Sequence, residues 1–124
     1  MIIKNANIFT AEHKFVKGDA AVTDGRFADP SDCKKEDGKV LDAEGLYMIP
    51  GLVDIHFHGC MGADMCDGTK EALDVITKYE ASIGVTSVCP ATMTIAKEEL
   101  RKVMKNAGDY EYSGGSHLVG INME

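Results

Sequence analysis

Two histidines one residue apart, His56 and His58, close an apolar stretch that runs from residue 50 to residue 59. On a β-strand the side chains alternate between two faces, so these imidazoles share one face, about 7 Å apart along the backbone. Pro50 suits the first position of such a strand because it has no N–H to donate, and Gly59 lets the chain turn after the second histidine. The pattern predicts a strand that ends in two side chains able to reach one divalent ion.

The strand expected over residues 50–59 is apolar at Leu52, Val53 and Ile55. This is typical of a parallel strand buried on both faces. Imidazoles at the carboxyl end of such a strand lie where α/β folds place their ligand sites. Asp54 would lie deeper on the histidine face, and because a buried carboxylate needs a partner, we expect it to orient a neighbouring group. The alternative is that the two histidines are ordinary polar residues at the rim of a sheet.

Residues 1–49 have the pattern of short strands joined by turns. Asp24 and Gly25 form a strong hairpin signal between two apolar segments. We expect these strands to meander as a small separate β-module, because no helical segment lies between them to connect parallel neighbours directly.

From residue 50 onward the pattern changes to strand, helix, strand, helix, strand. The first helix is expected between an N-cap at Thr69 and a stop at Gly84, and the second between Thr94 and Gly108. Residues 117–123 make the third strand. Strands that alternate with helices of this length predict βαβ units, a parallel sheet and the α/β fold class.

A complete (β/α)8 barrel takes about 250 residues, and three strands with two helices supply less than half of one. We therefore expect residues 50–124 to be the first three strands and two helices of a barrel in a longer protein. A natural three-stranded domain is the alternative, but its bare strand edges would favour aggregation.

Glu124 follows the third strand directly, as His56 and His58 close the first. In a barrel the carboxyl ends of all strands point to the same mouth, so these three side chains are expected to meet. Two imidazoles and one carboxylate suit Zn²⁺, and also Fe²⁺ or Mn²⁺ with additional oxygen ligands. The predicted cofactor is one or two divalent ions of this kind.

The composition excludes several classes of function. A net charge of −7 and a pI near 5.0 argue against a nucleic-acid surface. No apolar stretch reaches the roughly 18 residues of a membrane helix, and no secretory signal opens the chain. We therefore expect a cytoplasmic protein whose four cysteines are reduced. Cys60 and Cys66 flank the histidines, where a thiolate ligand is the alternative to an ordinary loop cysteine.

The stretch Pro-Gly-Leu-Val-Asp-Ile-His-Phe-His-Gly at residues 50–59 resembles the first barrel strand of the amidohydrolase superfamily. Within that superfamily the chain is similar to the N-acetylglucosamine-6-phosphate deacetylase family over its whole length. The segments that carry this narrower resemblance are residues 1–8, 62–69, 84–92 and 120–124.

The resemblance implies a metal-dependent hydrolase that releases acetate from N-acetylglucosamine 6-phosphate and leaves glucosamine 6-phosphate. It matches Glu124 to the acidic metal ligand that opens the family's Glu-Gly-Pro motif. It places the other ligands, the catalytic aspartate and the phosphate-binding residues beyond residue 124, so no catalytic residue is assigned here and the piece alone is expected to be inactive. It also implies that residues 1–49 are part of a β-sandwich, and we expect the full-length protein to form a homo-oligomer.

Two alternatives stay open at this point. One is another amidohydrolase, such as a dihydroorotase or an aminoacylase, which substrate turnover would separate from the deacetylase. The other is a non-catalytic metal-binding or docking module, which would be a monodisperse 124-residue chain with a cooperative unfolding transition.

Overall fold

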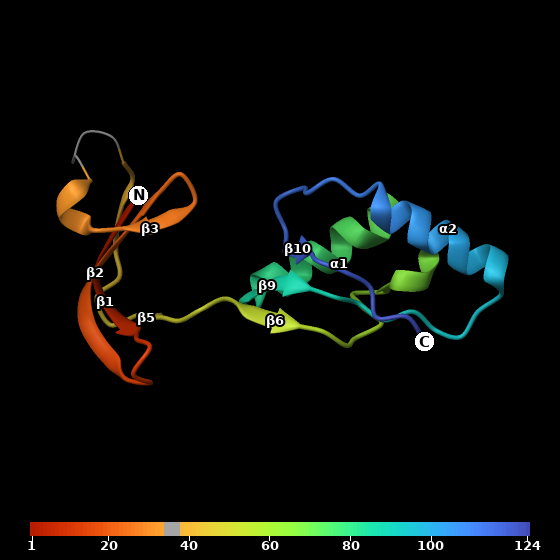
Figure 1. The fold of residues 1–124 in the computed structure, drawn as a ribbon, viewed down its shortest axis with the longest axis horizontal. Helices are drawn as coiled ribbons and strands as arrows, with labels where there is room; N and C mark the ends of the chain where they lie inside the picture. Colours follow the sequence, from red (N-terminus) through yellow and green to blue (C-terminus); the bar gives the residue numbers. More distant parts are fainter. Residues whose placement is uncertain (34–37) are drawn as a thin grey trace. The chain divides into compact units, whose positions relative to one another are not determined.

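The computed structural model describes residues 1–33 and 38–124, and these divide into two compact units, residues 1–50 and 51–124 (Figure 1). The fold is mixed α/β, as predicted. Among the described residues, no helix has both the length and the apolar character needed to cross a membrane. The elements in chain order are β1 (Ile2–Phe9), β2 (Phe15–Thr23), β3 (Arg26–Ala28), the 3-10 helix η1 (Pro30–Asp32), β4 (Val40–Asp42), β5 (Tyr47–Met48), β6 (Leu52–Asp54), β7 (Gly59–Cys60), β8 (Ala63–Asp64), the 3-10 helix η2 (Met65–Asp67), α1 (Lys70–Ser82), β9 (Val85–Val88), α2 (Lys97–Gly108) and β10 (His117–Leu118).

The first unit is one five-stranded sheet in the order β3-β2-β1-β4, with β5 also paired to β1. The predicted hairpin is confirmed, because β2 and β3 pair as antiparallel neighbours around Asp24 and Gly25. Both turn residues have positive φ, 51° and 72°, which suits the tight turn of a two-residue hairpin.

The expectation that residues 1–49 could not supply parallel neighbours directly was wrong. Strand β1 pairs in parallel with both β4 and β5. The chain between β1 and β4 runs through the hairpin of β2 and β3, so these parallel neighbours form without a helical connection. Small side chains pack at the centre of this sheet, where Ala6 and Ala21 are buried.

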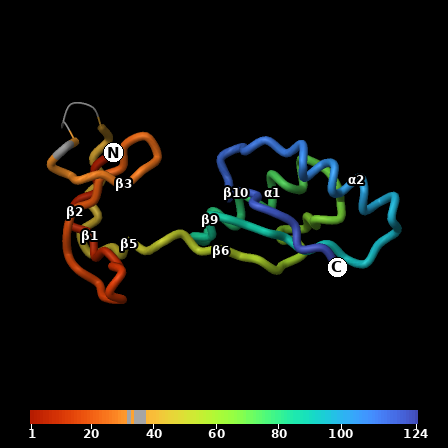
Figure 2. The backbone as a smooth tube through the Cα atoms, in the orientation of Figure 1, coloured from red at the N-terminus to blue at the C-terminus, as the bar shows by residue number. Residues whose placement is uncertain are grey.

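The second unit holds a three-stranded parallel sheet in the order β10-β9-β6, and α1 and α2 are the connections between successive strands (Figure 2). This arrangement is the one that alternating strands and helices predict. A short antiparallel pair, β7 and β8, follows β6.

The core of this unit is a cluster of Met65, Leu73 and Val103, each at most 2% exposed. Leu73 comes from α1 and Val103 from α2, so the cluster joins the two helices. Apolar residues at helical spacing therefore decide how the connections pack. Partly buried side chains around the cluster are Ile95, Ala107, Tyr110, Leu118 and Ile121.

The first helix begins as predicted, and the second does not. Thr69 Oγ1 accepts the backbone N–H of Ala72 at 3.2 Å and caps α1. Helix α2 begins at Lys97, three residues after the expected cap at Thr94, and its N-cap residue makes no side-chain hydrogen bond. Ile95, the first residue after the expected cap, packs against the core cluster in the segment before the helix.

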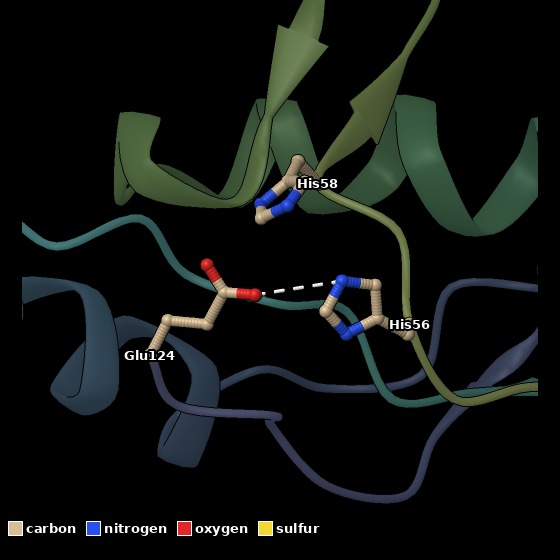
Figure 3. A group of neighbouring side chains, drawn as sticks. All are labelled: His56, His58 and Glu124. Atoms are coloured by element: carbon tan, nitrogen blue, oxygen red, sulfur yellow. Dashed lines mark ion pairs between the residues drawn. The ribbon is translucent and has the colours of Figure 1, made fainter.

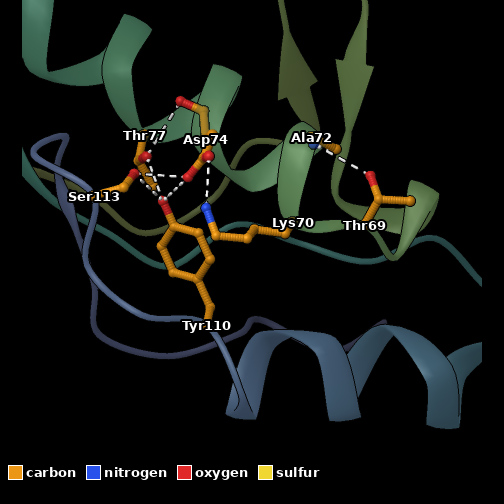
Figure 4. Close-up of polar contacts among 7 residues, drawn as sticks. All are labelled: Thr69, Lys70, Ala72, Asp74, Thr77, Tyr110 and Ser113. Carbon is orange, nitrogen blue, oxygen red and sulfur yellow. Dashed lines mark hydrogen bonds and ion pairs between the residues drawn. The ribbon is translucent and has the colours of Figure 1, made fainter.

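A polar cluster ties the segment after α2 to α1 (Figure 4). The Asp74 carboxylate on α1 accepts hydrogen bonds from Tyr110 Oη at 2.9 Å, from Ser113 Oγ at 2.6 Å and from Lys70 Nζ at 2.8 Å. Tyr110 Oη also lies 3.0 Å from the hydroxyl of the fully buried Thr77. These contacts hold the path of the chain toward β10 and toward the residues that follow it.

Candidate metal centre

The two histidines lie just past the end of β6 rather than within it. The strand was expected to continue to residue 59, but it ends at Asp54, whose Oδ1 accepts the backbone N–H of His56 at 3.0 Å. A side chain that bonds the backbone two residues on offers an alternative to the strand ladder and turns the chain. The turn still presents both rings to one region, with their centroids 5.4 Å apart and their planes at 83°.

The apolar residues of β6, and Ile55 directly after it, are not buried, which corrects the expectation of a strand covered on both faces. Leu52, Val53 and Ile55 are 50%, 60% and 67% exposed. The reason is that β6 is an edge strand of the three-stranded sheet in the described part of the chain, and an edge strand lacks the neighbours that a central strand has. Asp54 is half-buried, and its carboxylate holds the backbone of His56 rather than an imidazole ring.

Glu124 reaches the same place from the last described segment. Its backbone N–H donates to Thr92 Oγ1 at 3.3 Å, and Thr92 is fully buried in the segment after β9. Glu124 Oε1 lies 3.4 Å from His56 Nε2. Figure 3 shows both imidazole rings and this carboxylate turned toward one another.

The three predicted ligands come together in the structure. His56, His58 and Glu124 each offer one ligand atom, and these atoms lie within 4.8 Å of one another. Two imidazole nitrogens and a carboxylate oxygen are a donor set that Zn²⁺, Fe²⁺ and Mn²⁺ accept. The His56 side chain is 52% exposed and that of Glu124 39%, so the site is open to small molecules.

His58 gives the clearest sign that a cation fits here. Its Nδ1 is buried and has no hydrogen-bond partner among the described residues. A buried ring nitrogen without a partner costs free energy, and most such atoms in proteins are satisfied. A divalent ion at this trio would give the side chain a charged partner.

The cysteines near the histidines do not join this group. Burial raises the pKa of the Cys60 thiol, and the nearby Glu80 carboxylate raises it further, which disfavours the thiolate that a metal needs. Cys66 Sγ instead accepts the backbone N–H of Met93 at 3.2 Å. Asp64 and Asp67 form a capping box around η2.

Sequence reasoning missed two residues that hold the trio in place. Thr92 fixes the backbone of Glu124, and the Asn122 side-chain amide lies 2.9 Å from His56 Nδ1. Asn122 precedes Glu124 by two residues, so the alternation that paired the two histidines could have placed it on the same face. Nothing in the local pattern could have found Thr92, because its contact spans 32 residues of sequence.

Relatives of the chain are found among known proteins, although no family model matches it. The N-acetylglucosamine-6-phosphate deacetylase of Bacillus subtilis is 26% identical over the whole chain, which covers 33% of that protein. The crystal structure of the Pasteurella multocida protein of the same name superposes with a TM-score of 0.84 over 98% of this chain and 33% of its own, at 21% identity.

The chain resembles the N-acetylglucosamine-6-phosphate deacetylases. It spans a fifth to a third of the length of the first curated deacetylases that it matches. An adenine deaminase of Clostridium perfringens is 40% identical over 62 residues, which is 47% of this chain and 11% of that protein. The likeness to the deacetylases therefore extends over more of the chain, whereas the sequence identity to the deaminase is higher over a shorter segment.

Proposed function

We propose that this chain is part of a metal-dependent hydrolase of the amidohydrolase type that removes the acetyl group from N-acetylglucosamine 6-phosphate. The observation that carries the proposal is the meeting of His56, His58 and Glu124 at one point, in a chain whose whole length resembles the deacetylases. The products are acetate and glucosamine 6-phosphate.

The proposed architecture follows from the same features. Residues 50–124 are the first three strands and two helices of a (β/α)8 barrel, and residues 1–49 are part of a small β-sandwich. In support, three parallel strands alternate with two helices, and the proposed ligands follow the carboxyl ends of the first and third strands. The likeness to the Pasteurella multocida structure supports this fold.

In this proposal the residues of the chain bind the ion and keep its ligands in place. His56, His58 and Glu124 hold the ion, Thr92 fixes the backbone of Glu124, and the carboxylate contributes the negative charge that a cation needs. When bound, such an ion lowers the pKa of water and polarises the amide carbonyl. Asp54 is held by the backbone of His56, so we assign the proton transfer to the leaving amine to a residue outside 1–124.

The test is acetate release from N-acetylglucosamine 6-phosphate by the full-length protein, after metal removal and after reloading with Zn²⁺, Fe²⁺ or Mn²⁺. We expect release to need the ion and to fall with His58→Ala, together with the bound metal measured by elemental analysis. His117→Ala is the matched control, since His117 stacks on Tyr112 and lies outside the trio. Unchanged metal content and rate in His58→Ala would remove the site from the mechanism.

The match to the adenine deaminase favours a second candidate, hydrolysis of the exocyclic amine of adenine. The same metal-loaded protein should then release ammonia from adenine and no acetate from the sugar phosphate. Acetate release without ammonia release decides for the deacetylase.

A further inference from the structure

The Asn122 side chain contacts the ring nitrogen of His56 that faces away from Glu124. Its backbone is fixed on both sides, because its N–H donates to Pro90 O at 2.9 Å and its carbonyl accepts Thr92 N–H at 3.0 Å. Its Nδ2 lies 2.9 Å from His56 Nδ1 and 3.2 Å from the backbone carbonyl oxygen of Ile55. One amide group therefore meets the ring and the backbone beside it.

These contacts determine which atom of the amide is the donor. A backbone carbonyl can only accept, so the Asn122 atom next to Ile55 O is the NH₂ group. The second hydrogen of that NH₂ then faces His56 Nδ1, which must accept it. In the neutral ring the proton consequently lies on Nε2, where Glu124 Oε1 is 3.4 Å away and can accept it.

This tautomer is the wrong one for an ion held through the nitrogen that faces Glu124. A neutral imidazole that binds a metal through Nε2 carries its proton on Nδ1 and donates it to an acceptor. The His56 proton must move from Nε2 to Nδ1, with no net gain or loss at the ring. The Asn122 NH₂ group, which also donates to Ile55 O, cannot accept this proton, so the Asn122 side chain must leave His56 Nδ1.

We propose that Asn122 is a positioning residue that sets which nitrogen of His56 carries the proton, and that its side chain leaves the ring when a divalent ion binds. The inference rests on the metal site of the proposed function and assigns Asn122 a role in loading that site. The metal-free ring is then ordered, but its Nε2 carries a proton and binds an ion only after the Asn122 side chain has moved.

The first test is the tautomer of His56 in the full-length, metal-free protein, read from ¹⁵N–¹H long-range NMR spectra at a pH of about 8, where free imidazole is neutral. We expect the Nε2–H form in the wild type and a mixture of both forms in Asn122→Ala. Asn106→Ala, in helix α2, is the control and should leave the Nε2–H form in place. An Nδ1–H form in the metal-free wild type, or the same spectrum in Asn122→Ala, would overturn the proposal.

The second test is Zn²⁺ affinity with Asn122→Asp, whose carboxylate can only accept and so favours the Nδ1–H form before the ion arrives. We expect this variant to show Nδ1–H without metal and to bind Zn²⁺ about tenfold more tightly than the wild type. An unchanged tautomer in Asn122→Asp contradicts the proposal even if added charge tightens binding. Failure of the wild type to bind Zn²⁺ would refute the proposed metal site, and the metal-free spectra would still decide the role of Asn122.

Discussion

His58→Leu should stabilise the metal-free protein and destabilise the metal-loaded one. The buried Nδ1 of His58 has no partner among the described residues, and a buried polar atom without a partner costs about 1–3 kcal/mol. Leucine has a similar size and no polar atom, so it keeps most of the packing and removes that cost. We predict a gain in unfolding free energy of about 1 kcal/mol in the presence of a chelator.

The same substitution removes one of the three proposed ligands. A ligand present at 100 times its dissociation constant stabilises the folded state by about 2.7 kcal/mol, and His58→Leu should lose most of this gain. The sign of the difference between variant and wild type therefore inverts when Zn²⁺ replaces the chelator. The assay is the urea midpoint of the full-length protein under the two conditions.

His117→Leu is the matched control for this inversion. His117 is exposed and stacks on Tyr112 with ring centroids 4.3 Å apart, so its loss should change stability equally with and without metal. A His58→Leu variant that is less stable than the wild type under both conditions, by the same amount, would refute the assignment of His58 as an unpaired ligand.

Two further predictions concern the hydrogen bonds of Asp74. Lys70, Ser113 and Tyr110 hold the pKa of Asp74 in the folded protein well below its ordinary value of 3.8. Their hydrogen bonds to the carboxylate therefore stabilise the fold fully above pH 3.8, and this stabilisation is lost as the pH falls through the lower folded-state pKa. Unfolding free energy should therefore fall more steeply below pH 5 in the wild type than in Asp74→Asn, and equal slopes in urea melts would contradict this. Tyr110→Phe should lower the unfolding free energy at neutral pH by about 1–2 kcal/mol, and Tyr112→Phe by almost nothing. Equal urea midpoints for the two phenylalanine variants would argue against this role.

Local sequence signals predicted the local structures well. Asp24 and Gly25 predicted a hairpin because few residue pairs tolerate positive φ at both turn positions. Thr69 predicted the start of α1 because its hydroxyl can accept a backbone N–H within one turn. The start of α2 was missed, because the helix begins three residues after Thr94 and Ile95 packs against the core before it.

The alternation of side chains along a strand and the order of the strands predicted part of the candidate site. His56, His58 and Glu124 meet as predicted, yet the histidines lie past β6 because Asp54 turns the chain. The sequence pattern could not show this turn, since the same aspartate also suits a strand that continues. Nor could it show how exposed β6 is, because exposure depends on which neighbours a strand has.

The amino-acid sequence by itself determined the alternation of strands and helices, the hairpin, the first helix cap and the three side chains that could share an ion. These features depend on backbone preferences and side-chain alternation over a few residues. Only the tertiary structure decided that Thr92 fixes Glu124, that Asn122 holds the ring of His56, and that His58 Nδ1 is buried without a partner among the residues that the structure describes. The physical reason is that each of these contacts, or the lack of one, depends on segments that folding brings together. The distance between such segments in space cannot be derived from their separation in the sequence.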